Sequence, residues 1–443
     1  MAFPVIVVPG ITASSLRDEY PVGPETVWST LAKRYERIAL HPDDVRYEVQ
    51  EPARVVPDQL FEIAYGDLIK ELRHNLTEKA DEPTPVFPFA YDWRQPLEII
   101  EYQLEAFIQE VIDRTRLLRH FHRAGYAEQE DTPAVDLIGH SMGGLIIASY
   151  LGRTGRKSRV RKVATLGSPF RGSFEAVIKV ATGTADLGTG ESHSRERETA
   201  RLTPALYHLL PSFDGGIICD QDLELFRTDA WQPGVLETIA EYIRLYGLDP
   251  ARSKTARMEM AEAILAAMLL ESFEHRSRME ALKLSKAGLT SDDWLCVVGV
   301  GVRTRVRLRI DIKNGKPWFD LSSDERVQGW PAPTPADTGD GTVPYPGAVP
   351  SFLDPANLVC LSPEDFGYWE VGDRLLGKVT TLHAFLPNMN VVHRLITAHF
   401  KGAHNEQGRA NPTIWGWRAP HVGADQWKPP ISGLRDEALK KKK

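Results

Sequence analysis

The sequence predicts an α/β protein whose central sheet is mostly parallel and carries helices on both faces. In the first half of the chain, short apolar runs typical of buried strands alternate with longer segments of helical periodicity. Strands that alternate with helices in this way form parallel sheets. Hydrophobic residues make up 42% of the 443 residues and charged residues 26%, which is typical of a globular chain with a sizeable core.

The expected elements follow from the apolar pattern of each stretch. In the first half, strands are predicted at 3–8, 86–91, 134–138 and 162–166, and helices at 58–76 and 97–118. Strand patterns return at 294–298 and 303–312, and the last clear helix is predicted at 389–400.

The middle of the chain differs in character. Helical periodicity dominates residues 174–286, including 234–246 and 256–282, and no convincing strand lies between these segments. We therefore expect the core in two parts, 1–173 and 287–443, the second with a C-terminal tail. Residues 174–286 would form an inserted helical cap, or lid.

Composition and charge exclude several classes of function. A formal net charge of -7 leaves no overall basic field, so a nucleic-acid partner is not expected. No run approaches the roughly 18 apolar residues that span a bilayer, and no signal peptide is visible, so the chain as written is expected to be cytoplasmic. The three cysteines lack the spacing of a metal site, and no phosphate-binding glycine loop occurs. We expect neither a metal nor a cofactor.

The strongest chemical signal is the stretch 135–144, which reads Val-Asp-Leu-Ile-Gly-His-Ser-Met-Gly-Gly. It matches the Gly-x-Ser-x-Gly nucleophile elbow in its required context, between a strand and a helix. Such a sharp turn brings backbone segments so close that only very small residues fit beside the serine. The motif predicts an α/β-hydrolase fold with Ser141 as nucleophile.

Two backbone amides are candidates for an oxyanion hole. The amide of Met142 opens the helix that follows the serine and faces the same reacting centre. A second amide usually comes from the loop after an earlier strand, and Ile11, which follows a Pro-Gly turn, is in that position. An ordinary tight turn explains the same Pro-Gly pair equally well.

A serine nucleophile needs a histidine base and a carboxylate, which follow it in that fold in the order Ser, acid, His. Asp340 lies between glycines in a tight loop and is the favoured acid, with Asp337 as its main competitor. His383 lies in a loop before the last helix, where it can reach over the sheet edge, and is the favoured base. The competing histidines are His393, His399, His404 and His421.

Five motifs in this order resemble the lecithin:cholesterol acyltransferase-like branch of the α/β-hydrolases. They are Val-Pro-Gly at 8–10, Tyr-Asp-Trp-Arg at 91–94, the elbow at 139–144, a Gly- and Pro-containing turn at 167–173, and Gly-Asp-Gly-Thr-Val-Pro at 339–344. The resemblance implies Ser141 as nucleophile, Asp340 as acid, His383 as base and Ile11 as an oxyanion-hole donor. The chain lacks the disulfide-tied lid of the mammalian members, so the resemblance does not extend to their sterol specificity.

These observations predict a serine hydrolase that cleaves carboxylic esters, of the lipase, esterase or phospholipase type, through an acyl-serine intermediate. An acyltransferase that passes the acyl group to an alcohol is the main alternative. Hydrolysis of an amide or thioester, and a binding module without catalysis, are further alternatives. The expected partner is an ester or lipid-like small molecule, with transient contact with lipid surfaces. Apolar residues of the expected helix 256–282, such as Leu265 and Leu269, either bind the acyl chain or pack against neighbouring helices.

Overall fold

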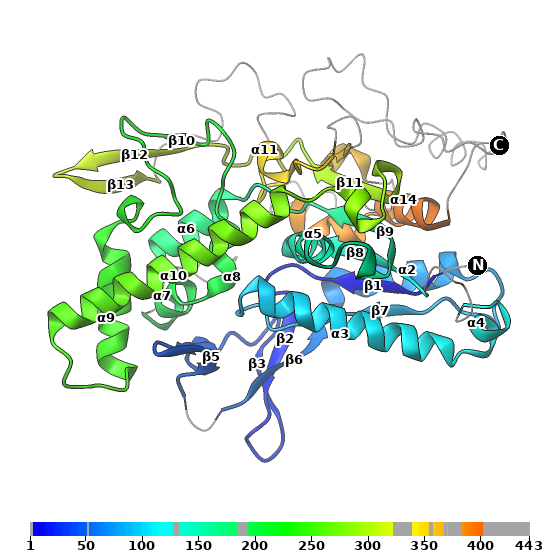
Figure 1. Ribbon diagram of the computed structural model, residues 1–443, viewed down its shortest axis with the longest axis horizontal. Coiled ribbons are helices and arrows are strands. Elements are labelled where there is room, and N and C mark those ends of the chain that lie inside the picture. The colour runs from blue at the N-terminus through cyan, green and yellow to red at the C-terminus, as the bar shows by residue number, and fades with distance from the viewer. Residues whose placement is uncertain are drawn as a thin grey trace.

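The computed structural model describes residues 3–50, 53–126, 133–183, 194–321, 339–353, 358–366, 370 and 382–401. At its centre is a six-stranded sheet in which every pair of neighbouring strands is parallel (Figure 1). Its strands, in spatial order, are β14 (Leu358–Leu361), β11 (Trp294–Gly299), β9 (Val160–Leu166), β8 (Val135–His140), β1 (Val5–Val8) and β7 (Val86–Pro88). The predicted α/β-hydrolase fold class is confirmed.

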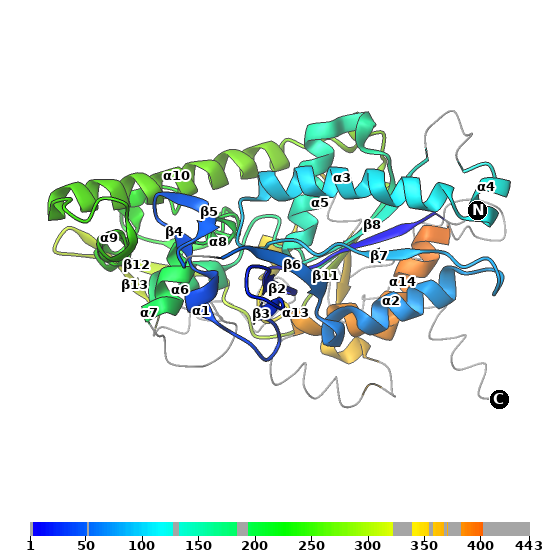
Figure 2. The same ribbon diagram turned by 90° about the horizontal axis from the view of Figure 1, so that it is seen from below.

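Helices cover both faces of this sheet. On one face lie α3 (Leu97–Arg116) and α5 (Met142–Thr154); on the other lie α2 (Glu62–Leu76) and α14 (Asn390–Lys401) (Figure 2). Strand β1 shows the division directly, because Val5 and Val7 belong to one apolar core and Ile6 and Val8 to the other. A strand that is covered on both faces must be apolar throughout, which explains its unbroken hydrophobic run.

A small β-rich region precedes α2 and was not predicted from the sequence. It contains an antiparallel sheet in the order β3 (Glu25–Trp28), β2 (Ser14–Asp18), β6 (Val55–Leu60). Helix α1 (Tyr35–Ile38) and the strand pair β4 (Leu40–His41) and β5 (Asp44–Glu48) complete it. The predicted helix at 58–76 therefore begins only at Glu62, because residues up to Leu60 belong to β6.

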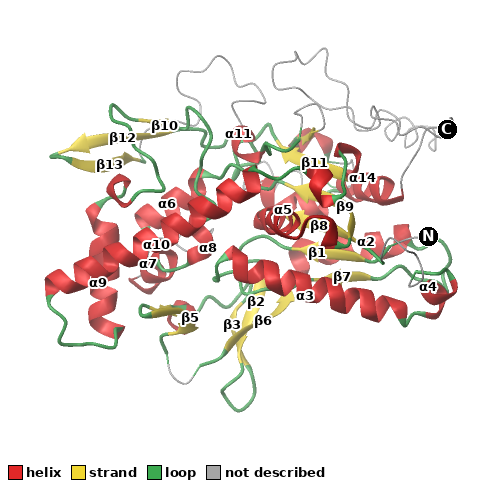
Figure 3. Ribbon diagram, in the orientation of Figure 1, coloured by secondary structure: helices red, strands yellow, loops and turns green. Residues whose placement is uncertain are grey.

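Residues 174–286 contain the expected helices, which gather beside the central sheet (Figure 3). These are α6 (Phe174–Thr182), α7 (Ser194–Arg201), α8 (Pro204–Tyr207), α9 (Pro233–Tyr246) and α10 (Lys254–Glu280). The expectation of no strand in this stretch is wrong, since β10 (Ile217–Ile218) pairs with β12 (Leu308–Lys313). Strand β13 (Lys316–Asp320) then pairs with β12, so this small sheet combines residues from both sides of position 286.

Shorter elements connect these parts of the fold. The short α-helices are α4 (Arg119–Arg123), α11 (Tyr345–Ala348) and α13 (Leu382–Phe385). The 3-10 turns are η1 (Gly155–Ser158), η2 (Thr228–Ala230), η3 (Leu284–Ala287), η4 (Ser291–Asp293), η6 (Pro363–Asp365) and η7 (Leu386–Asn388). Among the helices described here, none is long and apolar enough to cross a membrane.

Helix α10 packs along α9 and also contacts α5 and α8. Leu265 and Leu269, on its buried side, are completely inaccessible and belong to the main apolar core. Of the two alternatives for these leucines, the structure therefore supports packing against neighbouring helices. An acyl chain cannot reach a side chain that has no exposed surface.

The three cysteines lie in different surroundings and form no disulfide with one another. Cys296 on β11 and Cys360 on β14 are buried in neighbouring strands of the central sheet. Burial raises the pKa of the Cys296 thiol to about 12. Cys219 follows β10 and is partly exposed.

Candidate active site

Ser141 stands at the sharp turn between β8 and α5, at the carboxyl end of the parallel strands. Its backbone has φ 53° and ψ -126°, a conformation that residues with a side chain rarely adopt. Strain of this kind persists only where the surroundings enforce it, and it is often found at functional sites. The turn places the serine hydroxyl beyond the end of the strand.

Glycines make this turn sterically feasible. A Cβ atom on Gly139 would lie 2.7 Å from the backbone nitrogen of Gly144. A Cβ atom on Gly143 would clash with the carbonyl oxygen of Val8 in the neighbouring strand. The structure thus gives the physical reason for both glycines of the Gly-x-Ser-x-Gly pattern.

The structure brings Ser141, His383 and Asp340 together in one hydrogen-bonded line. Nε2 of His383 lies 2.9 Å from the Ser141 hydroxyl oxygen, and Nδ1 of the same ring lies 2.6 Å from Oδ2 of Asp340. The imidazole is held from both ends, with a different ring nitrogen facing each partner. All three side chains are buried: Ser141 is 6% exposed, His383 8% and Asp340 1%.

The carboxylate of Asp340 is fixed by its own loop. Its Oδ1 accepts hydrogen bonds from the backbone N–H groups of Thr342 (2.9 Å) and Val343 (2.7 Å), which leaves Oδ2 facing the histidine. The backbone N–H of His383 donates to the carbonyl oxygen of Asp340 (3.0 Å), so the loop of Asp340 is also joined to α13, the short helix that carries His383 where a loop was predicted. The acid and the base are therefore held as one unit.

Two further glycines provide the space for this pair. A Cβ atom on Gly167, at the end of β9, would lie 2.9 Å from Oδ2 of Asp340 and 3.1 Å from Nδ1 of His383. A Cβ atom on Gly299, at the end of β11, would clash with the Asp340 side chain. Sequence analysis noted the turn at 167–173 but had no signal for Gly299, whose role depends on strand order.

The loop after β1 lies directly against the serine. A Cβ atom on Gly10 would be 2.9 Å from Cβ of Ser141. The hydroxyl of Tyr91 donates to the carbonyl oxygen of Pro9 (2.8 Å). The indole N–H of Trp28 donates to the carbonyl oxygen of Thr12 (2.9 Å). Thr12 itself has a positive φ of 64°. Ile11 lies between these anchored residues, and Met142 opens α5 on the other side of Ser141.

The competing acid and base candidates fall elsewhere or outside the described residues. His393 and His399 lie on α14, where each is buried and bonded to a backbone carbonyl, of Pro387 (2.7 Å) and Val163 (3.0 Å) respectively. Asp337, His404 and His421 are not among the described residues.

The lecithin:cholesterol acyltransferase family matches residues 58–235, which include the Tyr-Asp-Trp-Arg motif and the nucleophile elbow. This stretch of the chain is similar to that family. The match supports an enzyme that acts on lipid esters, by hydrolysis or by acyl transfer.

Among solved structures, a chain of "The crystal structure of Tle4-Tli4 complex" is similar to this protein with a TM-score of 0.53. The two are 14% identical, and the match covers 78% of this chain and 88% of the other. At this identity the likeness concerns the fold. No curated protein matches the sequence.

The Tyr-Asp-Trp-Arg motif, which lies within the matched stretch, is a buried structural cluster. Arg94 donates to both carboxylate oxygens of Asp92 (2.8 and 2.7 Å), to Glu48 of β5 (2.7 Å) and to the carbonyl oxygen of Ile38 (3.0 Å). The two carboxylates raise the pKa of Arg94 above its usual value despite burial. The cluster fastens the β-rich region to the core and holds Tyr91, whose hydroxyl supports the loop of Ile11.

Two polar residues of the site, His140 and Tyr65, were missed by sequence analysis. Nδ1 of His140 lies 2.7 Å from the Tyr65 hydroxyl oxygen, and its Nε2 lies 3.0 Å from the carbonyl oxygen of His383. His140 stands inside the elbow motif, so its place beside the serine was visible in the sequence. Tyr65 had no such signal, because it reaches the site from the first turn of α2, far from the elbow in sequence.

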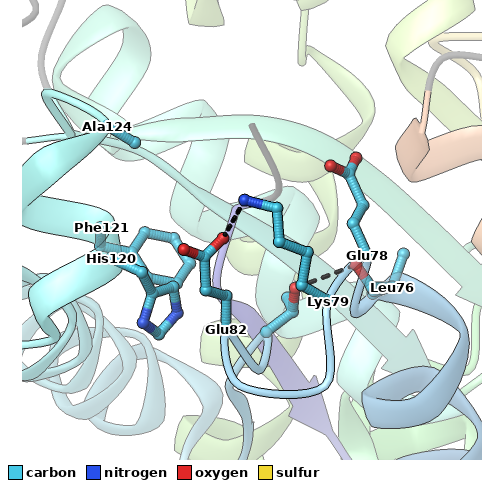
Figure 4. A pocket seen from close by; sticks show the side chains of 8 residues that line it. Leu76, Glu78, Lys79, Glu82, His120, Phe121 and Ala124 are labelled. Atoms are coloured by element: carbon cyan, nitrogen blue, oxygen red, sulfur yellow. Dashed lines mark hydrogen bonds and ion pairs between the residues drawn. The ribbon is translucent and has the colours of Figure 1, made fainter.

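A cavity of about 290 Å³ lies at the opposite, amino edge of the sheet (Figure 4). It is lined by residues between Leu76 and Thr84 and by His120, Phe121 and Ala124, and an ion pair joins Lys79 to Glu82 on one of its walls (3.1 Å). It precedes β7, whereas Ser141 follows β8, so the cavity is separate from the candidate site. No group of metal-binding side chains occurs within the described part of the chain.

Proposed function

We propose that the protein is a serine hydrolase that cleaves carboxylic esters of lipid type through an acyl intermediate on Ser141. The single observation that carries this proposal is the line from Ser141 through His383 to Asp340, at 2.9 and 2.6 Å. Both distances are within the range in which a nucleophile, a base and an orienting acid act together.

The hydrogen bonds fix the protonation of the base. A carboxylate only accepts hydrogen bonds, so Nδ1 of His383 carries the proton that Asp340 accepts. Nε2 is then unprotonated and accepts the hydroxyl proton of Ser141. Asp340 also stabilises the imidazolium that forms when this proton moves.

In the first half of the reaction, Oγ of Ser141 attacks the ester carbonyl carbon as its proton passes to His383. The carbonyl oxygen becomes an oxyanion, which the backbone N–H groups of Ile11 and Met142 stabilise. The imidazolium of His383 then protonates the leaving alcohol, and the carbon–oxygen bond to that alcohol breaks. The acyl group remains on Ser141 as an ester.

In the second half, His383 removes a proton from water, whose oxygen attacks the acyl-serine. The carboxylic acid leaves and the proton returns to Ser141. If an alcohol attacks instead, the product is a new ester.

We also propose that residues 174–286 act as a cap that selects the substrate. The residue just before this segment is tied to the site, since the Ser173 hydroxyl, at the N-terminus of α6, donates to the carbonyl oxygen of Thr342 in the loop of Asp340. The backbone N–H of Arg171 donates to Gly347 (2.7 Å), just beyond the same loop. Movement of this segment would therefore be transmitted to the loop that holds Asp340.

The decisive experiment combines labelling with substrate profiling. A fluorophosphonate probe should label wild-type protein at Ser141 with one equivalent, and Ser141→Ala should abolish labelling while the protein stays folded. Ser277→Ala, which changes an exposed serine of α10, is the matched control and should be labelled normally. Equal labelling of Ser141→Ala would overturn the proposal.

Substrate profiling then separates the two activities. Wild-type protein should cleave p-nitrophenyl esters, and a series of chain lengths would show how large an acyl group the site accepts. Adding a long-chain alcohol to the assay would reveal acyl transfer as a new ester product. Formation of free acid alone would identify a hydrolase.

A further inference from the structure

Beyond the three residues of the proposed mechanism, we propose that Tyr65 and His140 are positioning residues that hold the oxyanion-hole loop and the base in register. They form one continuous chain of hydrogen bonds from Gly10 to His383. This inference rests on the proposed function, because it assigns both residues a role in that reaction.

The direction of each hydrogen bond follows from the groups at the two ends. The backbone N–H of Gly10 donates to the Tyr65 hydroxyl oxygen (2.9 Å). At the other end, the carbonyl oxygen of His383 only accepts, so Nε2 of His140 carries the proton that it donates there (3.0 Å). Nδ1 of His140 is then an acceptor, and Tyr65 donates its hydroxyl proton to it (2.7 Å). Every group has one consistent role, and His140 has a single tautomer.

The hydrogen-bonded residues Tyr65 and His140 stay neutral while His383, the proposed base, gains and loses a proton. Burial, together with the neighbouring His383, lowers the pKa of His140 to about 3. The rings of His140 and His383 are 4.9 Å apart, so a second positive charge there would be repelled. Burial also raises the pKa of Tyr65. His140 therefore does not take part in proton transfer, and its contribution is geometric.

The two ends of this chain are the two parts of the site that must stay aligned with Ser141. Gly10 immediately precedes Ile11 and lies against Ser141, so the position of its backbone sets where the Ile11 amide points. The carbonyl of His383 belongs to the residue that accepts the serine proton. Misplacement of reacting groups by about 1 Å lowers turnover by about 100-fold. A rigid link between Gly10 and His383 would prevent such misplacement.

The first test removes the central hydroxyl. Tyr65→Phe deprives both Gly10 N–H and His140 Nδ1 of their partner, and we expect kcat to fall about 10- to 100-fold with KM changed less than about twofold. Tyr126→Phe is the matched control, since Tyr126 is equally buried and its hydroxyl donates to Ala134 at the amino end of β8. That control should keep wild-type kcat.

Two substitutions of His140 separate its hydrogen bond to Tyr65 from its hydrogen bond to His383. His140→Asn keeps an acceptor at the position of Nδ1 but loses the donor to His383, whereas His140→Gln keeps the donor and loses the acceptor. His140→Gln should weaken binding of an alkyl trifluoromethyl ketone, which forms an oxyanion on Ser141, more than binding of the matching ester. His140→Asn should chiefly alter the pH profile of kcat/KM, which reports the base.

Active-site titration with the fluorophosphonate probe distinguishes failure of this inference from failure of the proposed function. If wild-type Ser141 is not labelled, the proposed function itself fails. If Ser141 is labelled but Tyr65→Phe matches Tyr126→Phe in kcat per labelled site, the positioning role is refuted. Should Tyr65→Phe not fold, the two His140 variants decide the question, and unchanged ketone affinity and pH profile in both would overturn the inference.

Discussion

The contact between α10 and the core contains a buried acid whose ionisation should control stability. Oε1 of Glu101 on α3 lies 3.0 Å from Nε2 of His275 on α10, and its Oε2 lies 3.4 Å from Nε of Arg153. The Ser149 hydroxyl oxygen is 2.8 Å from the same His275 nitrogen. Burial raises the pKa of Glu101 from 4.5 to about 7, against the attraction of Arg153.

The size of the effect follows from this pKa. The unfolded chain releases the Glu101 proton near pH 4.5 and the folded chain near pH 7, so the folded state binds more protons in between. Stability should therefore fall as the pH rises through this window. One pKa unit is worth about 1.4 kcal/mol, so the full loss of unfolding free energy is about 3 kcal/mol. Glu101→Gln keeps the shape of the side chain and removes the titration.

The assay is urea unfolding of wild type and Glu101→Gln at pH 5, 6, 7 and 8, followed by tryptophan fluorescence. The difference in unfolding free energy between the variant and wild type should shift in favour of the variant by about 2 to 3 kcal/mol from pH 5 to pH 8. His275, whose pKa burial lowers to about 3, is present in both proteins. Glu105→Gln removes the exposed partner of Arg153 (2.8 Å) and separates that loss from loss of the buried acid. A stability difference that is independent of pH would refute the reasoning.

Three further predictions concern the site and its scaffold. Asp340→Asn should lower kcat by about 10⁴ without unfolding, because the histidine loses the partner that selects its tautomer; ester turnover within tenfold of wild type would contradict this. Gly143→Ala should lower the melting temperature, since the new Cβ would clash with the backbone of Val8. Gly234→Ala in α9 has open space around its Cβ and should not lower the melting temperature. Equal melting temperatures of the two variants would show that the elbow can relax. Dialysis against EDTA should leave esterase activity intact, and a loss that one metal reverses would reveal a metal requirement.

Local steric demands explain which features the sequence could predict. The elbow around Ser141 was visible because its glycines are required by contacts within a few residues and by the adjacent strand. The order of strands and helices was visible because a sheet buried on both faces needs largely apolar strands, as in β1. His383 could be favoured because it lies before the last helix, which contains two of its competitors, His393 and His399.

The missed features depend on long-range packing. Strands β2 to β6 are short and lack a regular alternation; β5, for example, has no buried residue at all. Tyr65 lies on the core-facing side of α2, as Leu68 and Leu72 do, and its sequence position alone does not set it apart. Only the folded structure brings its hydroxyl to His140. Leu265 and Leu269 show the same limit, because their periodicity fits a binding surface and a packed interface equally well.

The unequal burial of the three thiols makes the molecule suitable for single-site spectroscopy without engineering. Cys296 and Cys360 are sealed inside the sheet, and the raised pKa of Cys296 keeps it protonated at neutral pH. A maleimide dye should therefore attach first at Cys219, within the segment proposed as the cap. The natural protein would then carry an optical reporter on that segment, and energy transfer from a fluorescent acyl ester could follow cap and substrate during turnover.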